Sequence, residues 1–244
     1  MLRHLSLILT LCTALCGLAS DYESNAVKAR RMFHYREWAS AGALYSLMIA
    51  ERPQVTDSYG HAIVAAGMID DPAQQLRLTD MGLRNQIPVD SLFRSVERTS
   101  FSVGQTSLYE KYLLRVKQAE PWLARSIDSY LLKYYVYRRD AAGMIEYSRI
   151  MLAPVPDHKE FLYTLAQGYL LDGQTHNAID IYTRIVDLYP QALEALLYLG
   201  NYYSAYARSD TQARAQALTY LRRAQDIAPA PYLDAKISRL EAMR

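Results

Sequence analysis

The segment 159–192, KEFLYTLAQGYLLDGQTHNAIDIYTRIVDLYPQA, decides the fold of this 244-residue chain. Its large apolar residues recur at helical spacing in two runs, and Asp172 and Gly173 stand between the runs where a tight turn is expected. Pro190 follows the second run and predicts the end of a second helix. The segment therefore predicts two helices joined by a short turn, with the second packed against the first.

The order of large, small and aromatic residues in this segment is specific. The first helix carries two large residues, a small one and an aromatic one, and the second carries a small residue and then an aromatic one. These positions are Leu162, Leu165, Ala166, Tyr169, Ala178 and Tyr182. Together with the terminal proline, the 34-residue pattern resembles the tetratricopeptide repeat (TPR). Ile185 is the main departure, because the family usually has a small residue there.

The same pattern follows directly in residues 193–230. Its positions are Leu196, Leu199, Gly200 and Tyr203 in the first helix and Ala217, Leu221, Ala224 and Pro229 in the second. Five extra residues separate the two halves. Ser209 followed by Gln212 predicts a capping box at the start of the second helix.

Earlier helix pairs are predicted mainly by spacing. Asp71 is an expected N-cap with Pro72 at the first helical position, and Asp140 is another expected N-cap. The predicted units are 22–53, 57–88, 89–121, 122–156, 159–192 and 193–230, followed by a capping helix at 232–243. The resemblance implies an all-α fold, a right-handed superhelical α-solenoid of TPR-like helix-turn-helix repeats over residues 21–244.

The first 20 residues predict a signal peptide. Arg3 precedes the uncharged stretch from Leu5 to Ala19, and small residues suit cleavage on either side of Ser20. We therefore expect export, to the periplasm in a Gram-negative bacterium, with no transmembrane segment after signal removal. An uncleaved anchor and a lipid tether on Cys16 stay open as alternatives, although the residues before Cys16 match a lipobox poorly.

Composition and motifs favour a binding protein over an enzyme. The net charge is +2 and the sequence has no run of five Lys or Arg, which argues against nucleic acid as a partner. No nucleophile elbow, phosphate-binding loop or zinc-protease motif occurs, and the histidines His34, His61, His158 and His176 lack metal-ligand spacing. We expect no catalytic residue, metal or cofactor.

The resemblance implies that a protein or peptide segment binds in a concave groove lined by the first helix of each pair. By register, the groove candidates are Asp128, Tyr135, Tyr163, Gln167, Leu170, Leu197 and Asn201. Members of the family that grip a C-terminal carboxylate carry Lys and Asn at set positions, where this chain has Tyr163 and Gln167. An internal, partly apolar segment is therefore the expected ligand.

Two further expectations concern other residues. The alternative function is that of an enzyme or a small-ligand carrier with a site in the divergent region 88–121. The charged residues that could converge there are Glu97, Arg98, Arg115 and Glu120. Ordinary ion pairs on a solvated helix face would explain the same residues. Five tyrosines occupy core positions of the repeat pattern, and we expect them to pack in the core with the hydroxyl reaching solvent or a neighbouring carbonyl: Tyr130, Tyr134, Tyr169, Tyr182 and Tyr203.

Overall fold

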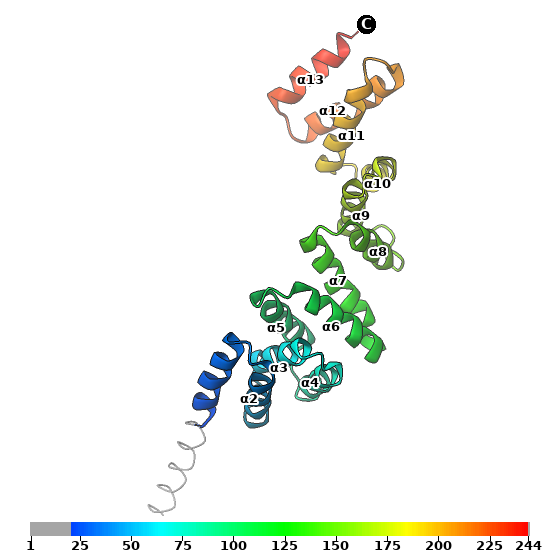
Figure 1. Cartoon of the computed structure of the whole chain (residues 1–244). Helices are drawn as coiled ribbons and strands as arrows, with labels where there is room; N and C mark the ends of the chain where they lie inside the picture. The colour runs from blue at the N-terminus through cyan, green and yellow to red at the C-terminus, as the bar shows by residue number, and fades with distance from the viewer. Residues whose placement is uncertain (1–20, 244) are drawn as a thin grey trace, which may run out of the picture. The chain divides into compact units, whose positions relative to one another are not determined.

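A computed structural model describes residues 21–243, and all regular secondary structure within that range is helical (Figure 1). The expectation of an all-α fold is confirmed. The described chain forms two compact units, unit 1 ending at Ala124 and unit 2 beginning at Arg125. The predicted signal peptide, with Cys12 and Cys16, lies outside the described residues.

Unit 1 is a series of helices in which sequence neighbours pack together. Its elements are residues 21–34, α2 (Trp38–Glu51), α3 (Thr56–Met68), α4 (Pro72–Arg84), α5 (Val89–Ser102), α6 (Thr106–Ala119) and the short 3₁₀ helix η1 (Pro121–Leu123). Helix α3 packs against α2, α4 and α5, and α6 packs against α4 and α5. Helices α3 and α4 thus contact each other, as do α5 and α6.

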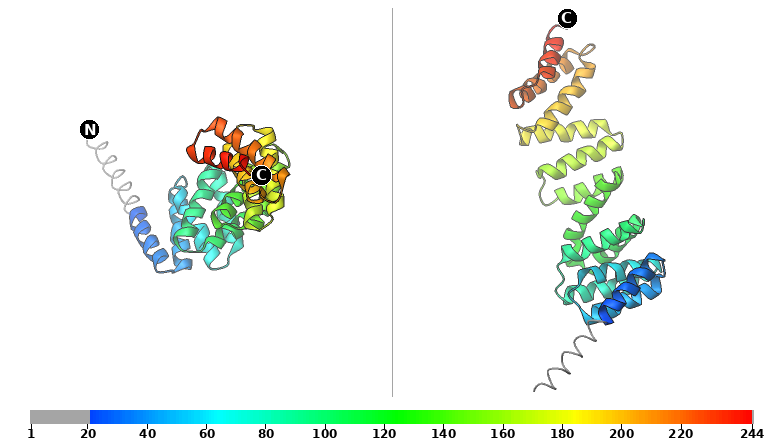
Figure 2. Two further views of the ribbon diagram at one scale, coloured as in Figure 1. Left: turned by 90° about the horizontal axis from the view of Figure 1, so that it is seen from above. Right: turned by 90° about the vertical axis from the view of Figure 1, so that its left-hand side faces the viewer.

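Unit 2 continues the same pattern of helix pairs. Its elements are α7 (Ala124–Arg138, from Arg125 onward), α8 (Ala141–Leu152), α9 (Lys159–Leu171), α10 (Thr175–Leu188), α11 (Leu193–Tyr206), α12 (Thr211–Ile227) and α13 (Pro231–Glu241). The pairing of α9 with α10 and of α11 with α12 can be followed in Figure 2. These two pairs correspond to the two segments with the clearest sequence pattern.

The predicted helix caps can be checked against the hydrogen bonds. The carboxylate of Asp71 accepts from the Gln74 backbone N–H at 2.9 Å, and the carboxylate of Asp140 accepts from the Gly143 N–H at 3.0 Å, which confirms both caps. The predicted capping box at Ser209 is wrong. Because α12 begins at Thr211, the N-cap is Asp210, which accepts from the Gln212 N–H at 2.8 Å.

The turns inside five of the six described helix pairs share one backbone conformation, and the turn between α11 and α12 is the exception. Arg36, Asp70, Gly104, Arg139 and Gly173 all have positive φ, between 52° and 74°, and each lies between the two helices of a pair. Successive members of this series are separated by 34, 34, 35 and 34 residues. The left-handed conformation favours glycine, yet three of the five residues are not glycine. The sequence predicted the turn at Gly173, whereas the shared backbone conformation of the five turns becomes visible only in the structure.

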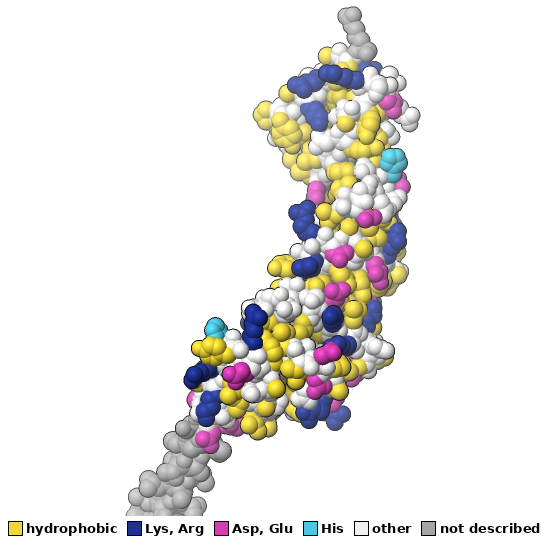
Figure 3. Space-filling view, in the orientation of Figure 1, with side chains coloured by type: hydrophobic (Ala, Val, Ile, Leu, Met, Phe, Trp, Pro, Cys, Tyr) yellow, Lys and Arg dark blue, Asp and Glu magenta, His cyan; other side chains and the backbone are white. Residues whose placement is uncertain are grey.

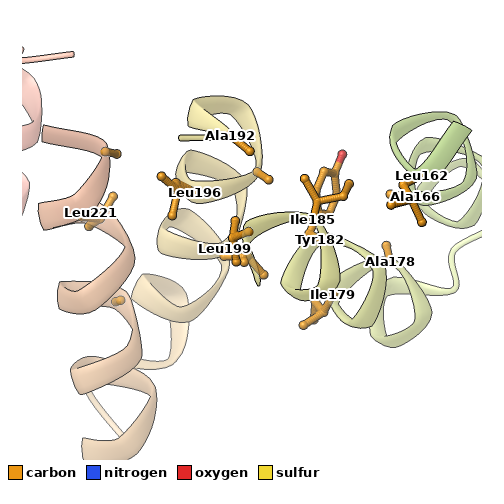
Figure 4. Packing of buried hydrophobic residues seen from close by; sticks show 14 of the residues in the cluster. Leu162, Ala166, Ala178, Ile179, Tyr182, Ile185, Ala192, Leu196, Leu199 and Leu221 are labelled. Carbon is orange, nitrogen blue, oxygen red and sulfur yellow. The ribbon is translucent and has the colours of Figure 1, made fainter. Parts of the chain in front are cut away.

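The core of unit 2 follows the predicted positions (Figure 4). Leu162 and Ala166 of α9, Tyr182 of α10, and Leu196 and Leu199 of α11 are all buried. These side chains come from successive helices, so the buried cluster is continuous along the stack. A repeat protein needs this continuity because a single helix pair cannot bury its own apolar face.

The five tyrosines expected in the core divide into two groups. Tyr134, Tyr169 and Tyr182 are buried, as predicted. Tyr130 and Tyr203 are half-buried, and Tyr203 packs against the core cluster of unit 2. The ring of Tyr203 stacks on Tyr220 at 6.0 Å, a surface-side aromatic contact between α11 and α12.

Helix α13 covers the end of the α11–α12 pair. Leu233, Ile237 and Leu240 are buried as part of the core cluster, so the terminal helix packs through an apolar side. Arg239 and Glu241 lie on the exposed side. None of the helices described in residues 21–243 is long and apolar enough to span a membrane.

Candidate partner-binding surface

A cavity of about 320 Å³ lies between α7 and α9, next to the start of α8. We call it the α9 pocket. Its lining residues are Val136, Arg139, Met144, Gln167, Leu170 and Leu171. Two of the seven predicted groove residues, Gln167 and Leu170, therefore lie together in one cavity.

The turn at Arg139 and a glycine in α9 position this pocket. Arg139, with its left-handed backbone, ends α7 and places the start of α8 beside α9. At Gly168, a Cβ atom would lie 3.1 Å from Cγ1 of Ile145 and 3.2 Å from Cβ of Met144, so α9 approaches α8 closely. The side chains of Val136 and Leu171 are left 41% and 42% exposed at the pocket. The α9 pocket thus combines an exposed amide with accessible apolar surface.

A second cavity, of about 660 Å³, lies between α11 and α13. We call it the α13 pocket. Its lining includes Asn201, Arg208, Tyr232, Lys236, Arg239 and Met243. The Nζ atom of Lys236 donates a hydrogen bond to the side-chain oxygen of Asn201. The predicted groove residue Asn201 therefore belongs to a different cavity from Gln167 and Leu170.

Two other predicted groove residues, Tyr163 and Leu197, are half-buried and pack against the core of unit 2. The ring of Tyr163 meets Tyr182 edge-on at 6.1 Å. Burial raises the pKa of Tyr163, so its hydroxyl stays protonated at neutral pH. Both side chains have a packing role besides any contact with a ligand.

The remaining two predicted groove residues lie on α7. The side chain of Asp128 is buried, with 6% of the residue exposed. The ring of Tyr135 covers the backbone of Gly143, where an added Cβ would lie 2.3 Å from the ring, and it stacks on Tyr147 at 5.3 Å. Tyr135 thus packs α7 against α8. Neither Asp128 nor Tyr135 is included in the proposed binding surface.

Sequence reasoning missed the contribution of α13. Tyr232, Lys236 and Arg239 follow one another at the i, i+4 and i+7 positions of one helix face, and all three line the α13 pocket. The sequence predicted only a capping helix at 232–243. The spacing was a usable signal, but only the structure shows that this face lies beside Asn201.

Unit 1 contains a third cavity, of about 390 Å³, beside an aromatic cluster. The rings of Phe33, Tyr45 and His61 line it, with His61 stacked on Tyr45 at 4.7 Å and edge-on to Phe33 at 4.9 Å. The Nδ1 atom of His61 donates to the Asp57 carbonyl at 2.8 Å. Burial lowers the pKa of His61 below its ordinary value of 6.5 and raises that of Tyr45 to about 12. Both rings are therefore neutral at neutral pH.

The residues of the alternative site have separate partners. Arg98 forms an ion pair with Asp57 at 2.9 Å, Arg115 donates to the buried Gln75 at 2.7 Å, and Glu120 accepts from the Trp122 ring. Of the four residues of this alternative site, Arg98, Arg115 and Glu120 thus bond to different partners rather than to one another. Within residues 21–243, no group of three or more His, Cys, Asp or Glu side chains is placed to hold a metal ion.

Comparison with solved structures finds one protein with a TM-score above 0.5, which shows a shared fold, and others with lower scores. A candidate protein-binding protein from Bacteroides ovatus is 16% identical and has a TM-score of 0.51, covering 78% of this chain and 98% of its own. A TPR repeat-containing protein from Cytophaga hutchinsonii is 12% identical, with a TM-score of 0.41 and coverage of 86% and 98%. A TPR protein from Bacteroides fragilis is 13% identical, with a TM-score of 0.37 and coverage of 91% and 99%. This chain has a TPR-like fold.

The TPR-like assignment agrees with the geometry described above. Helix pairs repeat with a period close to 34 residues, and the small residues Ala166 and Gly200 lie at close helix contacts. No family model matches the sequence, and no curated protein matches it. The TPR-like architecture is one that supports protein-interaction scaffolds.

Proposed function

We propose that this protein is an exported, non-catalytic TPR-like scaffold whose unit 2 binds an internal, partly apolar segment of a partner protein. The observation that carries the proposal is the α9 pocket, where predicted groove residues and exposed apolar side chains share one cavity. Gln167 and Leu170 are its central contacts, and Asn201, Tyr163 and Leu197 extend the surface along α9 and α11.

The chemistry of the α9 pocket suits a peptide in an extended conformation. The amide of Gln167 can both donate to and accept from a peptide backbone, whose N–H and C=O groups need partners once they leave water. Val136, Leu170 and Leu171 offer apolar contacts for a side chain on the same peptide. Backbone hydrogen bonds beside an apolar anchor are a recurring mode of peptide recognition.

The test is to select binding peptides from a random displayed library and to measure their affinities for the whole chain and its variants. Replacing Val136 and Leu171 together by asparagine should weaken binding about tenfold or more, because each substitution puts a polar amide in place of an apolar contact at the centre of the site. Fluorescence anisotropy with labelled peptides gives the dissociation constants.

A matched control comes from two apolar residues with the same exposure elsewhere in unit 2. Leu188 of α10 and Ile227 of α12 are 40% and 39% exposed. Replacing both by asparagine should leave peptide affinity within a factor of two or so, while thermal melting shows whether the two double variants are equally stable. Equal losses in the two double variants, or the absence of any selected peptide, would contradict the proposed binding surface.

Export is proposed from residues 1–20, whose charge pattern is typical of a signal peptide. Expressed in a Gram-negative bacterium, the protein should be recovered outside the cytoplasm with an N-terminus at Ser20 or Asp21. Intact-mass measurement of the purified protein tests this. A mass that retains Met1 would refute cleavage, and a diacylglyceryl adduct on Cys16 would establish the lipid tether instead.

A further inference from the structure

The lining of the α13 pocket carries three positively charged side chains. Arg208, Lys236 and Arg239 line the cavity, and no acidic side chain lines it. Among the side chains that the structure describes, none forms a salt bridge with any of these three residues. Figure 3 shows Lys and Arg side chains grouped around α13. Arg222, at the same end of unit 2, differs because it pairs with Glu241 at 2.6 Å.

Lys236 is half-buried and its ammonium group forms a hydrogen bond within the pocket. Burial lowers the pKa of Lys236, and the positive charge of Arg239 lowers it further. The hydrogen-bond partner of its ammonium group is the neutral side chain of Asn201. A concave site with unneutralised charges of one sign raises the local concentration of the opposite charge. The site therefore has the electrostatic character of a receptor for anions.

The pocket also has apolar edges that a simple inorganic anion would not use. The Tyr232 ring is 61% exposed at the cavity, and Met243 and Leu240 line it as well. An exposed aromatic ring beside guanidinium groups is typical of protein-binding surfaces, where tyrosine and arginine are enriched. The combination fits a chain that presents carboxylates and an apolar side chain together.

We propose that the α13 pocket binds an internal acidic segment of the partner, with its Asp or Glu carboxylates at Arg208, Lys236 and Arg239 and an apolar side chain on Tyr232. This inference rests on the proposed scaffold function and specifies the chemistry of its partner. Arginine suits this role because its planar guanidinium can hold a carboxylate with two parallel hydrogen bonds. Binding should weaken as salt is added, because exposed charges are screened.

The experiment uses the purified chain and peptides with acetylated N-termini and amidated C-termini, so that side-chain carboxylates are the only acidic groups. One labelled peptide alternates Glu with Leu, and its partner carries Gln in place of Glu. The Glu peptide should bind about tenfold more tightly at low salt, as measured by fluorescence anisotropy, and the difference should shrink as salt is added.

Two charge-reversal variants locate the site. Arg208→Glu/Arg239→Glu should weaken binding of the Glu peptide about tenfold or more and leave the Gln peptide nearly unaffected. Arg125→Glu/Lys133→Glu changes the net charge equally through two exposed residues of α7, and should leave the affinity within a factor of two or so. Thermal melting of both variants confirms that each is folded.

Three outcomes would overturn the acidic-segment proposal: equal affinity for the Glu and Gln peptides, equal losses in the two charge-reversal variants, or tighter binding to phosphatidylglycerol vesicles than to the Glu peptide. The scaffold proposal is tested separately by Val136→Asn/Leu171→Asn, which adds no charge. If that variant loses library-selected peptides while the Glu and Gln peptides bind alike, the scaffold proposal stands and the acidic-segment proposal fails.

Discussion

Replacing Tyr182 by alanine is expected to lower the free energy of unfolding by about 3 to 5 kcal/mol. Tyr182 is 3% exposed in α10, where its ring stacks on Tyr198 of α11 at 4.3 Å and meets the edge of Tyr163 of α9 at 6.1 Å. The ring therefore fills the space between three successive helices. Truncation would leave a cavity that these helices can close only in part.

Chemical denaturation monitored by circular dichroism measures this change. Tyr182→Phe keeps the ring and should cost no more than about 1 kcal/mol. Tyr206→Ala provides a second comparison, because Tyr206 is 50% exposed at the end of α11 and should cost well under half as much as Tyr182→Ala. A loss for Tyr182→Ala no larger than that for Tyr206→Ala would refute the packing role of this ring.

Replacing Gly200 by leucine is expected to destabilise the chain by about 1 to 3 kcal/mol through overpacking. A Cβ atom at Gly200 would lie 2.6 Å from Cδ2 and 2.8 Å from Cγ of Leu221, so α11 and α12 have no room for a larger side chain. The same direction is expected for Ala166→Leu, because Ala166 is fully buried in α9. Denaturation midpoints measure both variants.

The control for Gly200→Leu is Ala215→Leu, an exposed position on α12 where leucine should change stability by no more than about 0.5 kcal/mol. The double variant Gly200→Leu/Leu221→Ala should recover part of the loss, because it removes the atoms that a Cβ would meet. If Gly200→Leu and Ala215→Leu had the same midpoint, the close contact of α11 with α12 would be refuted.

Most of the fold was predictable because the repeat pattern couples local and tertiary structure. Large residues such as Leu162 and Leu196 recur at helical spacing, and small ones such as Ala166 and Gly200 occur where helices touch. Helix starts followed from side chains that bond the backbone, as Asp71 and Asp140 do. The error at Ser209 arose because Asp210, one residue later, offers a carboxylate for the same purpose.

The binding surface was less predictable, because register identifies a face of one helix but not what lies opposite. Register grouped Gln167 and Leu170 on one face of α9, whereas Arg139 and Met144, which also line their cavity, come from the preceding turn and helix. The cations of the α13 pocket face Asn201 only because α13 packs against the α11–α12 pair. Contacts of this kind depend on tertiary packing, which one helix pattern does not encode.

The positive-φ residues in the turns of the helix pairs affect how far the sequence of this repeat can diverge while its fold is kept. At Arg36, Asp70 and Arg139 the backbone adopts a left-handed conformation that costs a non-glycine residue roughly 1 kcal/mol. None of these three positions is occupied by glycine. A sequence comparison that expects glycine does not recognise these turns, although their backbone conformation is the same as at Gly104 and Gly173. Distant homologues of such a protein should therefore be sought by the spacing of turn conformations rather than by turn residues.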